Sequence, residues 1–153
     1  MTKPNDGDVI SQVSEQFTRA FRRMRRGVEK ELAPFGLTFS QARVLRVLGR
    51  AGGAVRIGDL AARLEIVPRS ATSMVDILEQ AGLAVREPDR SDRRSVLVSL
   101  TPAGASLLDR MGEARRVSAE ALFGTLDESE LATLHGLLKA LNAPDTPRGE
   151  EAS

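Results

Sequence analysis

The sequence contains no cysteine and only one histidine, His135, in 153 residues. The absence of cysteine excludes disulfides, thiolate nucleophiles, thiol redox sensing and cysteine-based zinc sites. A single histidine cannot form a multi-histidine metal site, so we expect no metal or cofactor, and we expect His135 to lie at a surface or an interface. Common nucleophile–base pairs and glycine-rich phosphate loops are also missing. The protein is therefore not expected to be an enzyme.

Aromatic side chains are scarce, with five Phe and no Trp or Tyr. Proteins that bind RNA or single-stranded DNA stack bases on aromatic side chains, so a nucleic-acid partner of this chain would be double-stranded DNA. No apolar run approaches the roughly 20 residues of a membrane helix. The polar start, residues 1–8, contains no signal core, and we expect a cytoplasmic protein.

The formal net charge is only +1, but the charges are unevenly distributed. Residues 1–56 contain eleven Lys and Arg against five Asp and Glu, whereas residues 103–153 contain five against nine. Almost all the cations are Arg, which favours bidentate contact with phosphate or carboxylate. A GC-rich coding genome would produce the same bias, so composition alone does not show whether the arginines serve to bind phosphate or carboxylate or only reflect codon usage.

Long amphipathic helices are predicted at both ends of the chain. Apolar residues recur every three to four positions from Val9 to Leu32, which predicts a helix over 9–34 that Pro34 and Gly36 end. Capping signals predict two further helices within 102–142. The first helix is too long to bury its whole apolar stripe within one small domain, so we expect part of it to pack on another subunit. Its other face carries an arginine cluster that we interpret as solvated or inter-subunit surface: Arg19, Arg22, Arg23, Arg25 and Arg26.

The middle of the chain predicts a helix-turn-helix. A Thr38-x-x-Gln41 capping box opens one helix, Val55–Ile57 reads as a short extended piece, a short helix follows over 59–64, and the next helix runs from Pro68 to about Ala81. Two short helices joined by a tight turn can place the second helix in the major groove of DNA. Its exposed start presents short polar groups and one arginine able to span guanine O6 and N7. The predicted DNA-contacting residues are Arg69, Ser70, Thr72 and Ser73.

A basic turn lies between two predicted strands, 83–86 and 96–100. The second strand alternates, placing Val96, Val98 and Leu100 on one half-buried face. We predict that Arg90, Arg93 and Arg94 at the tip contact DNA phosphates or enter a narrow minor groove. We also predict that Asp89 and Asp92 hold these guanidinium groups in place. For the loop alone, a solvated turn whose acids and arginines neutralise one another is an equal alternative.

A helix-turn-helix followed by a strand, a basic hairpin and a second strand makes a winged helix. The chain resembles the MarR (multiple antibiotic resistance regulator) family. The motifs that carry the resemblance are residues 64–83, Asp92-x-Arg94 and Leu100-Thr101, and the resemblance extends from the first long helix to about Leu141. The resemblance implies a homodimer built from the first and the last two helices, with Arg94 as the wing arginine and Asp92 as its partner. It also implies a repressor that releases DNA when a small aromatic acid or phenolic compound binds between the dimer helices and the winged helix.

Two departures from the family pattern stand out. Val67 occupies the position where many members have a Ser or Thr cap, so the recognition helix lacks a side-chain cap worth roughly 0.5–2 kcal/mol. The absence of cysteine excludes the thiol-sensing branch of the family. No shared motif marks the effector pocket, so effector-binding residues cannot be assigned.

The prediction is a mainly α fold with a small β-hairpin wing, forming one domain over 1–153. Dimerisation helices occupy 9–34 and 102–142, the winged helix-turn-helix occupies 38–100, and a disordered tail occupies 144–153. The predicted function is that of a homodimeric regulator that binds double-stranded DNA at a pseudopalindromic operator. The alternative is a winged-helix module that binds a protein and not DNA, because residues 57–102 contain six Lys and Arg against seven Asp and Glu.

Overall fold

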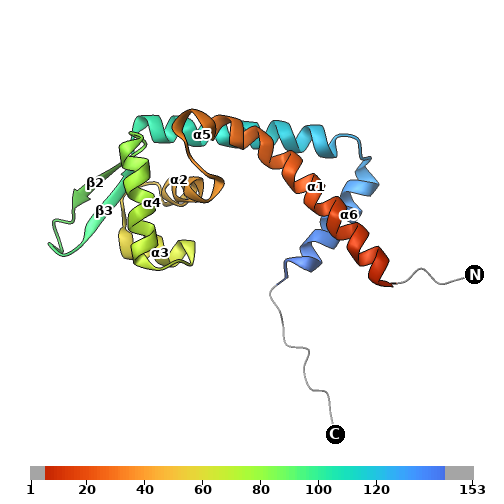
Figure 1. Cartoon of the computed structure of the whole chain (residues 1–153), viewed down its shortest axis with the longest axis horizontal. Coiled ribbons are helices and arrows are strands. Elements are labelled where there is room, and N and C mark those ends of the chain that lie inside the picture. Colours follow the sequence, from red (N-terminus) through yellow and green to blue (C-terminus); the bar gives the residue numbers. More distant parts are fainter. Residues whose placement is uncertain (1–5, 144–153) are drawn as a thin grey trace, which may run out of the picture.

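The computed structural model describes residues 6–143 and is mainly helical, with one small antiparallel sheet (Figure 1). This arrangement confirms the predicted fold class. The elements are α1 (Asp6–Leu32), the 3-10 helix η1 (Ala33–Phe35), α2 (Phe39–Ala51), β1 (Val55–Arg56), α3 (Ile57–Leu64), α4 (Pro68–Gln80), β2 (Ala84–Pro88), β3 (Val96–Leu100), α5 (Pro102–Phe123) and α6 (Glu128–Leu141). The tail predicted to be disordered, 144–153, lies outside the described residues.

Local capping signals set the helix boundaries as predicted. The amide of Gln41 donates to Thr38 Oγ1 at 3.3 Å, and the amide of Thr38 donates to Gln41 Oε1 at 2.8 Å. This reciprocal pair fixes the start of α2, and Gly52, with φ at 66°, ends it. Thr101 caps α5 by accepting from the Gly104 amide at 3.0 Å.

The sheet has the strand order β1-β3-β2, and both pairs are antiparallel. β2 and β3 pair from Ala84 opposite Leu100 to Pro88 opposite Val96, which leaves residues 89–95 as the hairpin tip. We call residues 84–100 the wing. In Figure 1 the wing projects at one end of the molecule, and α6 lies at the other.

Three details of the sequence prediction are wrong. Ile57 begins α3 and is not extended. Leu83 belongs to the turn before β2, where its amide donates to the carbonyl of Leu78 at 2.9 Å. The strand face with Val96, Val98 and Leu100 was expected to be half-buried, but Val98 is fully buried and Val96 is exposed. Val96 is exposed because it pairs with Pro88 at the outer end of the hairpin, beyond the core.

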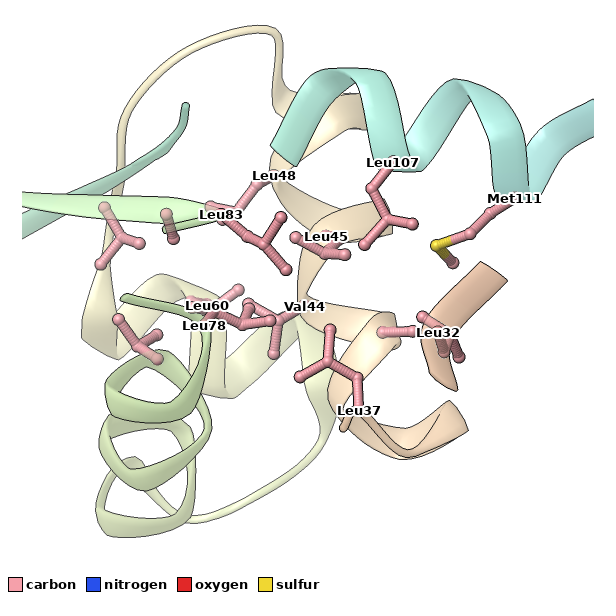
Figure 2. Close-up of a cluster of buried hydrophobic side chains, with 14 of the residues drawn as sticks. Leu32, Leu37, Val44, Leu45, Leu48, Leu60, Leu78, Leu83, Leu107 and Met111 are labelled. Atoms are coloured by element: carbon pink, nitrogen blue, oxygen red, sulfur yellow. The ribbon is translucent and has the colours of Figure 1, made fainter. Parts of the chain in front are cut away.

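The hydrophobic core joins α2, α3, α4, the sheet and the start of α5. Figure 2 shows Leu45, Leu60, Leu78, Leu83 and Leu107 converging there, all of them fully buried. Burying each such leucine contributes about 1.5–3 kcal/mol of transfer free energy. This core holds α4 and the wing in fixed positions. We call the part of the chain from α2 to β3 the lobe.

Helix α1 packs along α5 and carries the lobe on its C-terminal end (Figure 1). Gly27 lies against Ala114 and Ser118 of α5, so the two helices approach closely there. An ion pair between Arg110 Nε and Glu31 Oε2 at 3.0 Å also joins them. None of the helices within residues 6–143 is long and apolar enough to cross a membrane.

The N-terminal part of α1, the second half of α5 and α6 leave apolar side chains uncovered. Ile10 is 70% exposed and Leu141 is 78% exposed, and α6 contains no buried residue at all. We call these residues the exposed apolar set: Val9, Ile10, Val13, Phe17, Phe21, Val117, Leu131, Leu137 and Leu141. Within residues 6–143, the single-chain fold leaves more than a third of each of these side chains exposed.

Candidate nucleic-acid interface

The helix-turn-helix is formed by α3 and α4, with a tight connection at Glu65. Glu65 adopts a left-handed conformation, φ 57°, and its amide donates to the carbonyl of Ala62 at 3.1 Å. Non-glycine residues seldom adopt positive φ, but here that conformation turns the chain into α4. The apolar face of α4, with Ala71, Val75 and Leu78 buried, seats the helix on the core.

The opposite face of α4 presents the residues predicted to contact DNA. Arg69, Thr72 and Ser73 are exposed and Ser70 is half-buried. The hydroxyls of Thr72 and Ser73 donate to the carbonyls of Pro68 and Arg69, at 3.0 and 3.1 Å. These bonds hold both hydroxyls against the helix, with their oxygen lone pairs still able to accept a hydrogen bond.

The start of α4 lacks a side-chain cap, as the sequence predicted. Val67 occupies the N-cap position with extended backbone, φ −72° and ψ 147°, and forms no side-chain cap hydrogen bond. Pro68 follows at the first helical position, where its missing N–H costs nothing. The Ser70 amide donates to the carbonyl of Val67 at 3.0 Å, so the amide of Arg69 is the first-turn donor that no cap satisfies. A free donor at a helix start favours an anion.

The wing tip exposes three arginines, Arg90, Arg93 and Arg94. Within residues 6–143, none of their guanidinium groups forms an ion pair or a side-chain hydrogen bond. The structure thus brings all three to one solvent-facing turn, with their positive charges uncompensated.

The two wing aspartates support the wing, but they do not hold the tip guanidinium groups in place, and that part of the prediction is wrong. Asp89 is buried, at 7% exposure, and accepts from Arg56 Nε at 2.8 Å and from Ser91 Oγ at 2.6 Å. Asp92 accepts from the amide of Arg94 at 3.0 Å and from Ser95 Oγ at 2.7 Å. A short aspartate side chain bonds readily to backbone two residues ahead, so both residues fold the turn and neither pairs with the tip guanidinium groups.

Asp89 also ties the wing to β1. Its ion pair with Arg56, 2.8 Å long, crosses from the hairpin to the neighbouring strand. The bonds from Ser91 and the charge of Arg56 lower the pKa of Asp89 to about 2. The bonds from Ser95 and the Arg94 amide likewise lower the pKa of Asp92. Both groups therefore support the wing in their charged form.

Arg86 is a structural residue that the sequence reading missed. Arg86 ends the predicted strand 83–86, and its guanidinium binds three groups on α4: Asp76 at 2.6 Å, Glu79 at 2.7 Å and the carbonyl of Thr72 at 3.0 Å. The spacing of Asp76 and Glu79, one turn apart on α4, is the signal that could have indicated it. Arg86 thereby fastens the wing to the recognition helix.

A cavity of about 520 Å³ lies where α1, α2 and α5 meet, away from α4 and the wing tip. Four arginines line it, together with an apolar wall that includes Phe21, Phe39 and Met111. The four arginines are Arg25, Arg46, Arg50 and Arg115. The sequence assigned no residues to such a site, because its members come from three separated helices.

Comparison with known proteins identifies relatives along most of the chain. A family model described as "MarR family" matches residues 35–95. The HTH-type transcriptional regulator YkoM of Bacillus subtilis is 30% identical over 123 residues, which cover 80% of this chain and 79% of YkoM. The HTH-type transcriptional repressor MdtR of the same organism is 27% identical over 139 residues, covering 90% and 89%.

Solved structures agree with the sequence relatives. A MarR mutant from Escherichia coli, crystallised in complex with operator DNA, superposes with a TM-score of 0.66 at 26% identity. The match covers 88% of this chain and 96% of that one. A match of this extent is longer than the winged helix alone and includes much of the long helices.

Proposed function

Because this chain belongs to the MarR family of winged-helix regulators, we propose that it binds double-stranded operator DNA as a homodimer and represses transcription until a small ligand binds. The observation that carries the proposal is the pairing of an exposed polar helix start on α4 with three uncompensated arginines at the wing tip. Both lie on one lobe, and Arg86 holds them together.

Each element has dimensions and chemistry that suit a different groove. The major groove of B-DNA admits an α-helix, and α4 brings Arg69, Ser70, Thr72 and Ser73 to base edges and phosphates. A narrow minor groove attracts arginine because its negative potential is enhanced. In this assignment Arg94 enters the minor groove, while Arg90 and Arg93 contact the backbone beside it.

A second copy of the chain supplies the missing partner of the exposed apolar set. Exposed apolar side chains gathered on a few helices are typical of an interaction site, and these lie on the helices proposed for dimerisation, within 9–34 and 102–142. A two-fold axis through these helices presents two α4 helices to one face of the duplex. Half-sites then lie about one helical turn, about 10 bp, apart on a pseudopalindrome.

The ligand-controlled part of the proposal is supported by the cavity at the junction of α1, α2 and α5. Its volume falls within the roughly 300–1,000 Å³ of small-molecule sites. The cavity lies between the long helices and the lobe. A small aromatic or phenolic ligand bound there can therefore alter the spacing between the lobes of the two protomers. The repressor MdtR, whose alignment covers 90% of this chain and 89% of its own, supports repression as the mode of action.

The test is binding to the DNA upstream of the protein's own gene, measured by fluorescence anisotropy at about 0.15 M salt. We expect tight binding that weakens steeply as salt rises, because arginine–phosphate contacts release counterions. Absence of salt-sensitive binding to this DNA would instead favour the winged helix as a module that binds a protein and not DNA. Equal binding to a scrambled duplex would contradict operator recognition.

Arg94→Ala sharpens the test. Losing an arginine contact in a groove costs about 1–3 kcal/mol, so operator affinity should fall about tenfold or more while the dimer stays intact by sedimentation. Arg116→Ala is the matched control, since Arg116 lies on α5 and pairs with Glu113 and Glu120. Unchanged operator binding by Arg94→Ala would reject the wing as a DNA contact.

A further inference from the structure

The cavity between α1, α2 and α5 has an unusual charge. Four arginines line it, and the residues that line it include no acid. Of the four, Arg25 pairs with Glu29 of its own helix, at 3.0 Å between Nη2 and Oε1. Within residues 6–143, Arg46, Arg50 and Arg115 form no ion pair and no side-chain hydrogen bond. Three positive charges therefore line one cavity, and no acid within residues 6–143 pairs with them.

Two of the four arginines, Arg25 and Arg46, stack on the ring of Phe39. The guanidinium of Arg25 lies 4.5 Å from the ring centroid of Phe39, and that of Arg46 lies 4.7 Å from the same ring. The Nε of Arg25 is buried and has no hydrogen-bond partner. Stacking on an aromatic ring stabilises a cation but leaves its N–H donors available for an acceptor.

The charges also disfavour one another. Burial, followed by the charges of Arg115, Arg43 and Arg50, lowers the pKa of Arg46. A protein gains stability by separating such groups or by pairing them with acids. Their convergence on a cavity of about 520 Å³ is explained if an anion occupies it.

The rest of the lining is apolar. Met24 and Val28 of α1 and Leu108 and Met111 of α5 face the hollow along with the two phenylalanines. Such walls accommodate a hydrocarbon body, while guanidinium groups bind carboxylate or phosphate in a bidentate manner. The site is thus suited to a molecule that is apolar in its body and anionic at more than one position.

We propose that this cavity binds an organic anion with at least two negative charges on an apolar body, either a dicarboxylate or a phosphate monoester, and that Arg46, Arg50 and Arg115 recognise the charges. The inference rests on the proposed function only in taking this ligand as the effector. It narrows the expected effector from a phenol or a simple aromatic acid to a dianion.

The experiment uses four probes with the same naphthalene body: 2-naphthol, 2-naphthoate, naphthalene-2,6-dicarboxylate and 2-naphthyl phosphate. The chain has no Trp or Tyr, so naphthalene fluorescence can report binding to the full-length protein with little protein background. At about 0.15 M salt we expect one of the two dianions to bind about tenfold or more tightly than the monoanion, equivalent to about 1.4 kcal/mol. The stronger of the two dianions identifies the head group.

Two neighbouring arginines provide a matched pair of variants. Arg115→Gln removes a cavity cation and should erase most of the preference for the dianion over 2-naphthoate. Arg116→Gln, one position along α5 and paired with Glu113 and Glu120 outside the cavity, should leave the preference unchanged. Circular dichroism checks that both variants are folded.

Three outcomes would overturn the proposal. They are that neither dianion binds, that neither dianion binds more tightly than the monoanion, and that Arg115→Gln leaves the preference for the dianion unchanged. Because no DNA is present, these outcomes are independent of operator recognition. Adding the bound dianion to the protein–operator complex is a separate measurement. Failure to release DNA would reject the effector role and would leave the anion site standing.

Discussion

Arg69 is the residue on α4 with the reach and the donor geometry to read a base. It is exposed at the second position of the helix, and a guanidinium can bind guanine O6 and N7 together. We expect Arg69→Ala to lower affinity for the operator by about 1–3 kcal/mol while reducing non-specific binding much less. Competition between operator and random duplex measures the ratio. If both affinities fell equally, Arg69 would be a phosphate contact only.

Asp89 gives the wing a defined pH dependence. Its pKa is about 2 in the folded chain, against an ordinary value of about 3.9. The charged form is therefore favoured by folding, and its stabilising contribution is present above about pH 4 and lost as the pH falls from about 4 to 2.

We expect Asp89→Asn to lower the free energy of unfolding at pH 6 and to differ progressively less from the parent protein as the pH approaches 2. Denaturant unfolding at a series of pH values measures this difference. Asp109→Asn is the control, because Asp109 is exposed on α5 and forms no ion pair or side-chain hydrogen bond within residues 6–143. A difference that stays constant with pH would contradict the role given to Asp89.

At the scale of elements, α4 has an uncapped start that a single substitution can repair. Val67 is 63% exposed and already has the extended backbone of an N-cap residue. Val67→Thr introduces an oxygen that can accept from the amide of Arg69 or Ser70, and should raise the free energy of unfolding by about 0.5–1 kcal/mol.

The matched control is Val85→Thr, the same chemical change at an exposed position of β2, where no helix begins. Chemical unfolding at one fixed protein concentration compares the two variants. Equal effects at both positions would show that the hydroxyl acts through solvation and not through capping.

The elements themselves were largely predictable because their signals are local. The Thr38–Gln41 capping box, the Thr101-Pro102 helix start and the apolar periodicity of α4 each lie within a few residues of sequence. The site was only partly predictable. The exposed positions of Arg69 and Arg94 followed from helical phase and from the hairpin turn.

The contacts that position the site depend on residues far apart in the chain, and these escaped prediction. Arg56 reaches Asp89 across 33 residues, and Arg86 binds acids on the preceding helix. Charge spacing in a loop cannot distinguish a carboxylate that binds a neighbouring guanidinium from one that folds its own turn. The cavity arginines could not be predicted for the same reason, because they come together only when α1, α2 and α5 pack against one another.

At the scale of the whole molecule, the exposed apolar set predicts the oligomeric state. Val13 lies on the apolar face of α1, where a second copy is expected to cover it, whereas Gln12 lies on the polar side of the same turn. Burying an unpaired carboxylate at an interface is costly, so Val13→Glu should weaken the dimer about tenfold or more.

Sedimentation velocity over a concentration series measures this effect, with Gln12→Glu as the control that adds the same side chain to the other face. Loss of the dimer should also remove most of the operator affinity, because each lobe then binds one half-site alone. A monomer in the parent protein at micromolar concentration would contradict the assembly.

If the proposed function holds, the Arg86 contacts have a consequence for how DNA would be released. Since one guanidinium bonds to two carboxylates and a carbonyl of α4, the hairpin and the helix beside it translate and rotate as a unit. In the proposed homodimer, the geometry that can still change is the separation and tilt between the units of the two protomers. A small molecule lodged where α1, α2 and α5 meet would then switch the regulator by mismatching its two halves to the pitch of the duplex, with neither reading surface deformed.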